Sequence, residues 1–414
     1  MKIKRTEFFI AVCCLLIFGM LQISYCFIET NAYGYMGFET EFNASLFVGT
    51  NFLAIVLVAV ACFNSRPPLI KNILTLLVVF FVFPSLIMFC YNPEYVWSLL
   101  ASYLFLFFLF FFLSRYKLSF SGPIIDPIKH SWLLMLVFSS MLIPYFFLYG
   151  SSINLKNLLL VDIYETRQAH ASIGNLYTGY TYSLLAKFLL PALIVVYLIR
   201  KNYMRAVLIM SMLIFLFFCG AHKAILFSFF LIFIFYFSPY RIKLRNLLLI
   251  ILLLLSSAQI AFLMADNLFI EANVIQRTFF LNQLLDIFYL KEFGDEPLHW
   301  SNSFLKNFIS YNHEAEPAYI IGEKYFKSPE MQANNGIVSD GLMNFGFIGM
   351  MINSVFFSVI FIYLASLRLS HRFFGLFFIL IITFQNSPLS TALMTHGILL
   401  FLIFAQLVLK KSDR

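Results

Sequence analysis

The chain has 414 residues, of which 61% are hydrophobic and only 12% charged, so an ordinary soluble domain is excluded and a polytopic membrane protein is indicated. The formal net charge of +8 does not indicate nucleic-acid binding, because the basic residues cluster at the ends of apolar runs, where they orient helices in a bilayer. The six cysteines lie in or beside apolar runs, with no disulfide framework and no metal-ligand spacing. We therefore predict an all-α membrane protein that needs neither metal nor cofactor.

The chain starts with basic residues and an apolar run, as a signal peptide does, but no small-residue cleavage site follows, so we predict a retained first membrane helix. A bilayer core of about 30 Å needs roughly 20 apolar residues per helix. On this rule about twelve membrane helices are predicted: Phe8 to Phe27, Leu46 to Phe63, Ile70 to Cys90, Val96 to Ser114, Ser131 to Tyr149, Gly179 to Ile199, Arg205 to Cys219, Ala224 to Phe237, Leu247 to Ala265, Leu342 to Leu367, Phe373 to Phe384 and Leu393 to Leu409.

Basic residues predict the orientation of these helices. With a cytoplasmic N-terminus, alternate threading places nearly all basic clusters in cytoplasmic loops and nearly all acids on the opposite face, as the positive-inside rule requires. We expect a single integral membrane domain over residues 1–414, with both termini cytoplasmic. Residues 150–178 and the large loop 266–341, between the ninth and tenth helices, would then be external.

The external loop 150–178 holds Arg167, whose planar guanidinium suits bidentate binding of a phosphate. An ion pair with Glu165 at the surface is an equally good interpretation. Lys187 follows within the sixth predicted helix, at a depth where a charge usually faces a cavity or a partner. Its long side chain could instead extend to the outer interface.

The turn "FFCGAHKAILF" places His222 and Lys223 between two short apolar runs, where the N-terminus of the following helix favours an anion. Contact with lipid headgroups is the alternative.

The interval from Asp266 to Asp340 is the longest polar stretch of the chain. Within it, "NVIQRTFFLNQLLDIFYLKEFG" has the apolar spacing of an amphipathic helix on the membrane surface, ending at Gly294 and carrying Arg277 near the headgroups. Further on, His313 adjoins Glu314, a pair suited to general-base catalysis, although a solvated loop histidine is the commoner case. Asp340 closes the interval as a weaker alternative base.

The whole pattern resembles the Wzy-type O-antigen polymerases of bacterial inner membranes. The resemblance covers nearly the full chain in architecture and is specific in "DIYETR", "GAHKAILF", "EPAYIIGEKY" and "NNGIVSDGLMNFGFIGMM". It implies a GT-C-like fold with periplasmic loops at 150–178 and 266–341. The implied activity is transfer of an oligosaccharide from undecaprenyl diphosphate to the non-reducing end of another lipid-linked repeat unit. A chain-length regulator and a flippase are the implied protein partners.

Arginines in two large periplasmic loops resemble the family's substrate-binding residues, and Arg167 and Arg277 occupy such loops. The arginine-x10-glycine pattern of some family members is absent: Gly179 comes one residue late after Arg167, and Phe288 stands where a glycine would follow Arg277. Within this resemblance, we expect the cationic side chains to bind the diphosphate and His313, Glu314 or Asp340 to act as base. The residues expected to bind substrate are Arg167, Lys187, His222, Lys223, Arg277, and, by stacking on sugars, Trp300, Tyr311 and Tyr319. Aromatic residues near a membrane interface are more often membrane anchors.

Two other functions remain open from the sequence. An O-antigen ligase would share the architecture but pass the glycan to the lipid A core. A flippase for lipid-linked oligosaccharides would need no base and should show shorter loops and more charged residues along its helices than this chain has.

Overall fold

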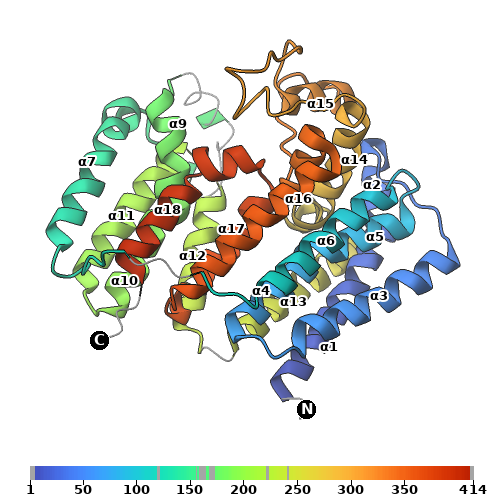
Figure 1. The fold of residues 1–414 in the computed structure, drawn as a ribbon, viewed down its shortest axis with the longest axis horizontal. Helices are drawn as coiled ribbons and strands as arrows, with labels where there is room; N and C mark the ends of the chain where they lie inside the picture. The colour runs from blue at the N-terminus through green and yellow to red at the C-terminus, as the bar shows by residue number, and fades with distance from the viewer. Residues whose placement is uncertain are drawn as a thin grey trace. The chain divides into compact units, whose positions relative to one another are not determined.

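The computed structural model describes residues 5–118, 122–154, 156–157, 165–166, 173–220, 223–239 and 242–410. Over these ranges the chain is helical and contains no β-strand (Figure 1). Eight helical stretches are long and apolar enough to cross a membrane, so the chain is a polytopic helical membrane protein. They are Arg5–Met36, Ala44–Cys62, Pro68–Tyr91, Ser131–Tyr149, Leu176–Ile199, Tyr203–Gly220, Lys243–Ala265 and Ile337–Ser366. Shorter apolar helices are Trp97–Leu113, His371–Gln385 and Ile398–Leu409.

Eleven of the twelve predicted segments coincide with a helix, because an uninterrupted apolar run of this length has few other ways to satisfy its backbone groups. The twelfth, Leu393 to Leu409, crosses a break between two helices at His396 and Gly397. Four of these helices are shorter than a full span, and α12 (Lys223–Phe237) has only 15 residues. The helical membrane class is therefore confirmed. The total of twelve spans and the GT-C-like arrangement stay predictions.

The chain divides into two compact units. Unit 1 comprises Met1–Lys117, Arg241–Ile362 and Ile381–Leu389, and unit 2 comprises Leu118–Tyr240, Tyr363–Leu380 and Ser390–Arg414. The helices of unit 1 are α1 (Arg5–Ser24), η1 (Tyr25–Glu29), α2 (Thr30–Tyr33), η2 (Gly34–Met36), α3 (Ala44–Cys62), α4 (Pro68–Leu77), η3 (Val78–Val82), α5 (Phe83–Tyr91), α6 (Trp97–Leu113), α13 (Lys243–Ala265), η8 (Glu271–Phe280), α14 (Leu281–Phe293), α15 (Pro317–Phe326) and most of α16 (Ile337–Ser366).

The helices of unit 2 follow the same apolar pattern. They are α7 (Ser131–Tyr149), η4 (Gly150–Ser152), α9 (Leu176–Ser183), η6 (Leu184–Leu189), α10 (Leu190–Ile199), α11 (Tyr203–Gly220), α12, η9 (His371–Phe373), most of α17 (Phe374–Gln385), η10 (Thr391–Thr395), α18 (Ile398–Phe404) and η11 (Ala405–Leu409). Gly220 ends α11 where the Tyr182 hydroxyl oxygen would lie 2.1 Å from any added Cβ, so this close approach requires glycine.

The core of unit 1 is the continuous helix formed by α4, η3 and α5. Among the 18 most apolar consecutive residues of this helix, 94% are buried inside the protein. The corresponding share in α13 is 28%, so the apolar surface of α13 suits contact with lipid. Proline at the first turn of α4 removes a backbone N–H that would have no helical partner anyway. Phe80 of this core stacks on Phe279 of η8 with ring centroids 5.3 Å apart. The polar interval of the sequence therefore contributes a helix to the apolar core.

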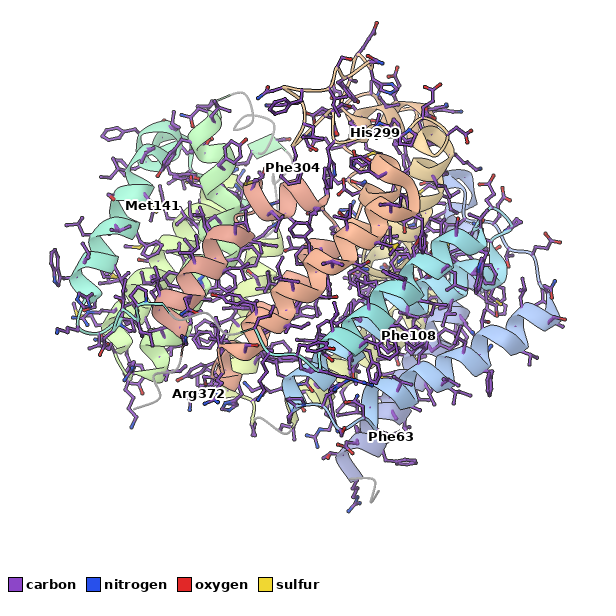
Figure 2. All side chains as sticks on the ribbon, in the orientation of Figure 1. Phe63, Phe108, Met141, His299, Phe304 and Arg372 are labelled. Carbon is purple, nitrogen blue, oxygen red and sulfur yellow. The ribbon has the colours of Figure 1, made fainter. Side chains whose placement is uncertain are left out.

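The two ends of unit 1 hold different parts of the chain. At the end near the N-terminus, Lys71 forms an ion pair with Glu7 at 2.7 Å, and Arg66 donates a hydrogen bond to the Phe111 carbonyl at 3.2 Å. Phe63 lies at this end and His299, in the long polar interval, at the other (Figure 2). The polar loop thus lies at the end of unit 1 opposite to Phe63.

Candidate functional site

The helix formed by η8 and α14 organises the polar interval. It runs from Glu271 to Phe293 and ends at Gly294, where the sequence predicts its end. Its burial differs from the predicted position on the membrane surface, because polar as well as apolar side chains face the protein. The buried polar side chains of α14 are Asn282, Gln283 and Asp286. A helix with buried polar groups on an otherwise apolar core needs partners for those groups inside the protein.

Asp286 finds such a partner in α6. The Tyr103 hydroxyl donates a short hydrogen bond to Oδ2 of Asp286, and both side chains are fully buried. Burial raises the pKa of Asp286 to about 6, and hydrogen bonds from Ser339 and Tyr103 partly offset this rise. Asp286 therefore holds its proton to a higher pH than a carboxyl group in water does.

The last residue of α17 and the residue after it hold the middle of the η8–α14 helix. Gln385 donates from Nε2 to the Thr278 carbonyl at 2.7 Å and to the Phe80 carbonyl at 2.8 Å. Asn282 donates to Oδ1 of Asn386 at 3.1 Å. Both bonded positions follow Arg277 along the helix, and Gln385 joins the helix to Phe80 of the α4–η3–α5 core.

Arg277 itself is exposed, while its neighbours Gln276 and Phe279 are buried. No hydrogen bond or ion pair of its guanidinium occurs within the part of the chain that the structure describes. The helix thus presents an unpaired, forked cation on a rigid support, an arrangement suited to a carboxylate or phosphate.

Asp340 holds a break in α16. Its Oδ1 accepts a hydrogen bond from Asn344 Nδ2, and its Oδ2 accepts from Asn353 Nδ2 and from the Leu389 backbone N–H, each at 3.0 Å. The side chain is 2% exposed. Because the carboxylate is buried and accepts three hydrogen bonds, Asp340 has a structural role in holding the break. Its role as a base stays a prediction.

The break itself lies at Phe345 and Gly346, where the backbone leaves helical geometry. Gly346 has φ 57° and ψ −143°, a conformation that is strained for any residue with a Cβ. Before and after the break, Gly341 and Gly349 bring the two helical pieces into backbone contact: a Cβ on Gly349 would lie 2.2 Å from the Gly341 carbonyl oxygen. The membrane helix predicted from Leu342 to Leu367 thus coincides with α16, and the glycines of "DGLMNFGFIG" explain the break within it.

The broken helix also fixes part of the external loop. Trp300 and His299 donate their backbone N–H groups to Oδ1 and the carbonyl oxygen of Asn344, at 2.7 and 3.0 Å. Both residues have positive φ, 53° for His299 and 56° for Trp300, which is rare for residues with side chains and often occurs at functional sites. The indole of Trp300 packs edge-on against Phe345. Trp300 is half-buried and His299 exposed, so a sugar could reach them only from the loop side.

The remaining loop candidates lie at the far end of the η8–α14 helix. His313 is exposed and packs edge-on against Phe293 with ring centroids 5.7 Å apart, and its other ring neighbour is Tyr311. The Tyr311 hydroxyl donates to the Ala315 carbonyl at 2.6 Å. Glu314 is exposed, and Tyr319 is half-buried.

Arg277 and His313 are consequently far apart. At about 1.5 Å per residue, the helix carries Arg277 roughly 24 Å along its axis from Phe293, which His313 contacts. A general base must come within about 3 Å of the proton that it removes. The structure therefore does not bring Arg277 and His313 together at one reacting bond.

The other predicted substrate-binding residues belong to unit 2. Lys187 lies in the π-helical turn η6 with its Nζ 3.4 Å from Nε2 of His396, so its partner is an imidazole rather than an acid. Lys223 is the first residue of α12. Arg167 and His222 lie outside the described residues.

Sequence reasoning missed several buried polar residues, above all Glu29 and Glu271. Both are fully buried, and each follows a Phe-Ile pair, in "FIET" and "FIEA". An acid embedded in an apolar run is the signal that could have identified them. Among the described residues, no group of three or more His, Cys, Asp or Glu side chains could hold a metal ion.

No protein-family model matches this sequence, and neither does any curated protein or solved structure.

Proposed function

We propose that the protein is a glycosyltransferase that polymerises lipid-linked oligosaccharide repeat units, of O-antigen or of a capsular or exopolysaccharide, at the periplasmic face of the bacterial inner membrane. The observation that carries this proposal is Arg277, an exposed guanidinium without a protein partner on a helix fastened into the core of a membrane protein. Such a group matches the diphosphate of a polyprenyl-linked donor.

In the proposed reaction, a hydroxyl oxygen at the non-reducing end of the acceptor glycan attacks the anomeric carbon of the donor. The new glycosidic bond forms as the bond between that carbon and the diphosphate oxygen breaks, and the lipid diphosphate leaves. The hydroxyl proton passes to a nearby base or to water. A single displacement inverts the configuration at the anomeric carbon, by the same logic as one-step glycoside hydrolysis.

Arg277 would stabilise the charge that develops on the departing diphosphate. Because a diphosphate is already a good leaving group, a positioned cation can supply much of the stabilisation without a metal. The base must then lie near Arg277, and His313 and Glu314 do not. We assign the loop with Trp300, Tyr311 and His313 to the glycan instead, because an oligosaccharide extends away from its diphosphate.

A strain from which the gene has been deleted tests the proposal. A polymerase predicts that single repeat units accumulate on the lipid A core, because ligation and export still occur. Long chains that remain on their lipid carrier would indicate a ligase, and repeat units stranded on the cytoplasmic side would indicate a flippase.

A further inference from the structure

The two buried glutamates of unit 1 lie on different helices that pack together. Glu29 ends η1, and Glu271 begins η8. Gln276 of η8 donates from Nε2 to Oε2 of Glu29 at 3.0 Å, and Tyr25 of η1 packs on Phe280 with ring centroids 5.4 Å apart. The charge of Glu271 acts directly on Glu29, and Ser24 lies beside Glu271. The two carboxyl groups therefore occupy one buried polar site.

This site has unused hydrogen-bonding capacity. Both glutamates have zero exposed area. Oε1 of Glu29 and both carboxyl oxygens of Glu271 have no hydrogen-bond partner of normal geometry among the described residues. Two ionised carboxylates buried in this way would each lack the solvation or ion pairing that a buried charge needs.

The groups around the pair do not supply a positive charge. From η1 and α2 the titratable neighbours are Tyr25, Cys26 and Tyr33, and Cys90 and Tyr91 of α5 follow behind Cys26. All of these are neutral at neutral pH. From α13, Gln259 donates to the Met20 carbonyl and to Ser24 Oγ. No lysine, arginine or histidine among the described residues acts on either glutamate.

We infer that Glu29 and Glu271 form a proton-binding site, in which one proton shared by the two carboxyl groups fastens η8 to the first membrane helix. A hydrogen bond between a carboxylic acid and a carboxylate satisfies oxygens of both groups and removes one charge. A metal cation fits less well, because calcium takes six to eight oxygen ligands and the nearby Gln276 amide presents its N–H group to Glu29.

The proton state of the site follows from burial. Burial raises the pKa of Glu271 to about 7, with Glu29 and Ser24 partly offsetting the rise. An unfolded glutamate ionises near about 4.3. The folded protein thus holds a proton that the unfolded chain has lost, so its stability is highest at low pH and falls as the pH rises through about 7.

The consequence for Arg277 rests on the proposed function, whereas the proton site does not. Arg277 stands on the same π-helical segment as Glu271. Loss of the shared proton leaves two buried like charges that repel across the contact between η1 and η8. Release of η8 from η1 would then displace the Arg277 guanidinium. Glycan transfer should therefore weaken above neutral pH.

Infrared spectroscopy of the purified protein in lipid nanodiscs tests the site without any substrate. In the wild-type protein, we expect a protonated-carboxyl band that persists well above pH 4.3 and disappears near pH 7. Asp286 contributes to this band in every variant, so Glu271→Gln and Glu29→Gln should each reduce the part that disappears near pH 7, whereas Glu41→Gln, at an exposed position, should leave the band unchanged. If one variant does not accumulate, the other carries the test, because either substitution removes one acid of the pair.

Thermal unfolding gives the second readout. The wild-type unfolding temperature should fall between pH 5 and pH 8, and Glu271→Gln should abolish most of that fall. The inference is overturned if the band is unchanged in both glutamine variants. It is also overturned if Na⁺ or Ca²⁺, added at constant pH, removes the band and raises the unfolding temperature, since a cation would then occupy the site. Failure of the polymerase proposal would leave both readouts unaffected.

Discussion

The η8–α14 helix and the loop from Gly294 to Glu316 form one polar interval in the sequence, yet they differ in how their polar groups are used. In the helix, Asn282 and Asp286 are buried and bonded to other helices. In the loop, His313 and Glu314 are exposed. A polar side chain inside a membrane protein is retained either by partners that hold it or by a substrate that needs it. Arg277 combines the two situations, because its support is buried and its guanidinium is not.

Removing the acceptor that holds the broken helix should have the largest effect. Asp340→Ala takes the carboxylate away from Asn344, Asn353 and the Leu389 N–H. Each buried donor left without an acceptor costs about 1–3 kcal/mol, so the three donors together predict a loss of about 3–9 kcal/mol. The measurement is the unfolding free energy or temperature of the purified protein in detergent.

Asp340→Asn distinguishes this structural role from catalysis. The asparagine keeps the shape but presents an NH₂ group to neighbours that are themselves donors, so it should also destabilise the protein. Asp295→Ala, at an exposed position, is the control. A stable Asp340→Asn protein that lacks only activity would contradict the structural role and restore Asp340 as the base.

Arg277→Lys should have the next largest effect, on activity rather than on stability. Lysine keeps the charge but loses the planar fork, and removal of one donor that stabilises developing charge typically costs about 10²- to 10³-fold in rate. Turnover of purified lipid-linked repeat units measures this loss. Lys306→Ala, an exposed cation of the loop, should retain activity. Normal chain length in Arg277→Lys would remove Arg277 from the site.

The sequence predicts the helices of this fold well, because long apolar runs and basic flanks are local signals. It also predicts the end of α14 at Gly294. The burial of Asp286 and the pairing of Glu29 with Glu271 depend on contacts between segments far apart in the chain, which no local periodicity reports. For the same reason, the sequence alone suggests that His313 and Arg277, in one polar interval, act together. In the structure, most of the length of the η8–α14 helix separates them.

His313→Ala should have the smallest effect, and it separates the two ends of the helix most directly. As the base, His313 would contribute about 10²- to 10⁴-fold to turnover. The structure places it beside Phe293, about 24 Å along the helix from Arg277, so we expect a loss of less than about tenfold.

The kinetic parameters show which role His313 has. If it contacts the glycan, the substitution should raise KM for the acceptor and leave kcat nearly unchanged, because such a contact is equal in the ground state and the transition state. Glu314→Gln serves as the matched variant at the neighbouring exposed position. A large fall in kcat for His313→Ala, with normal donor binding, would mean that the loop brings His313 to the reacting bond, and the diphosphate would then have to bind near Phe293 rather than at Arg277.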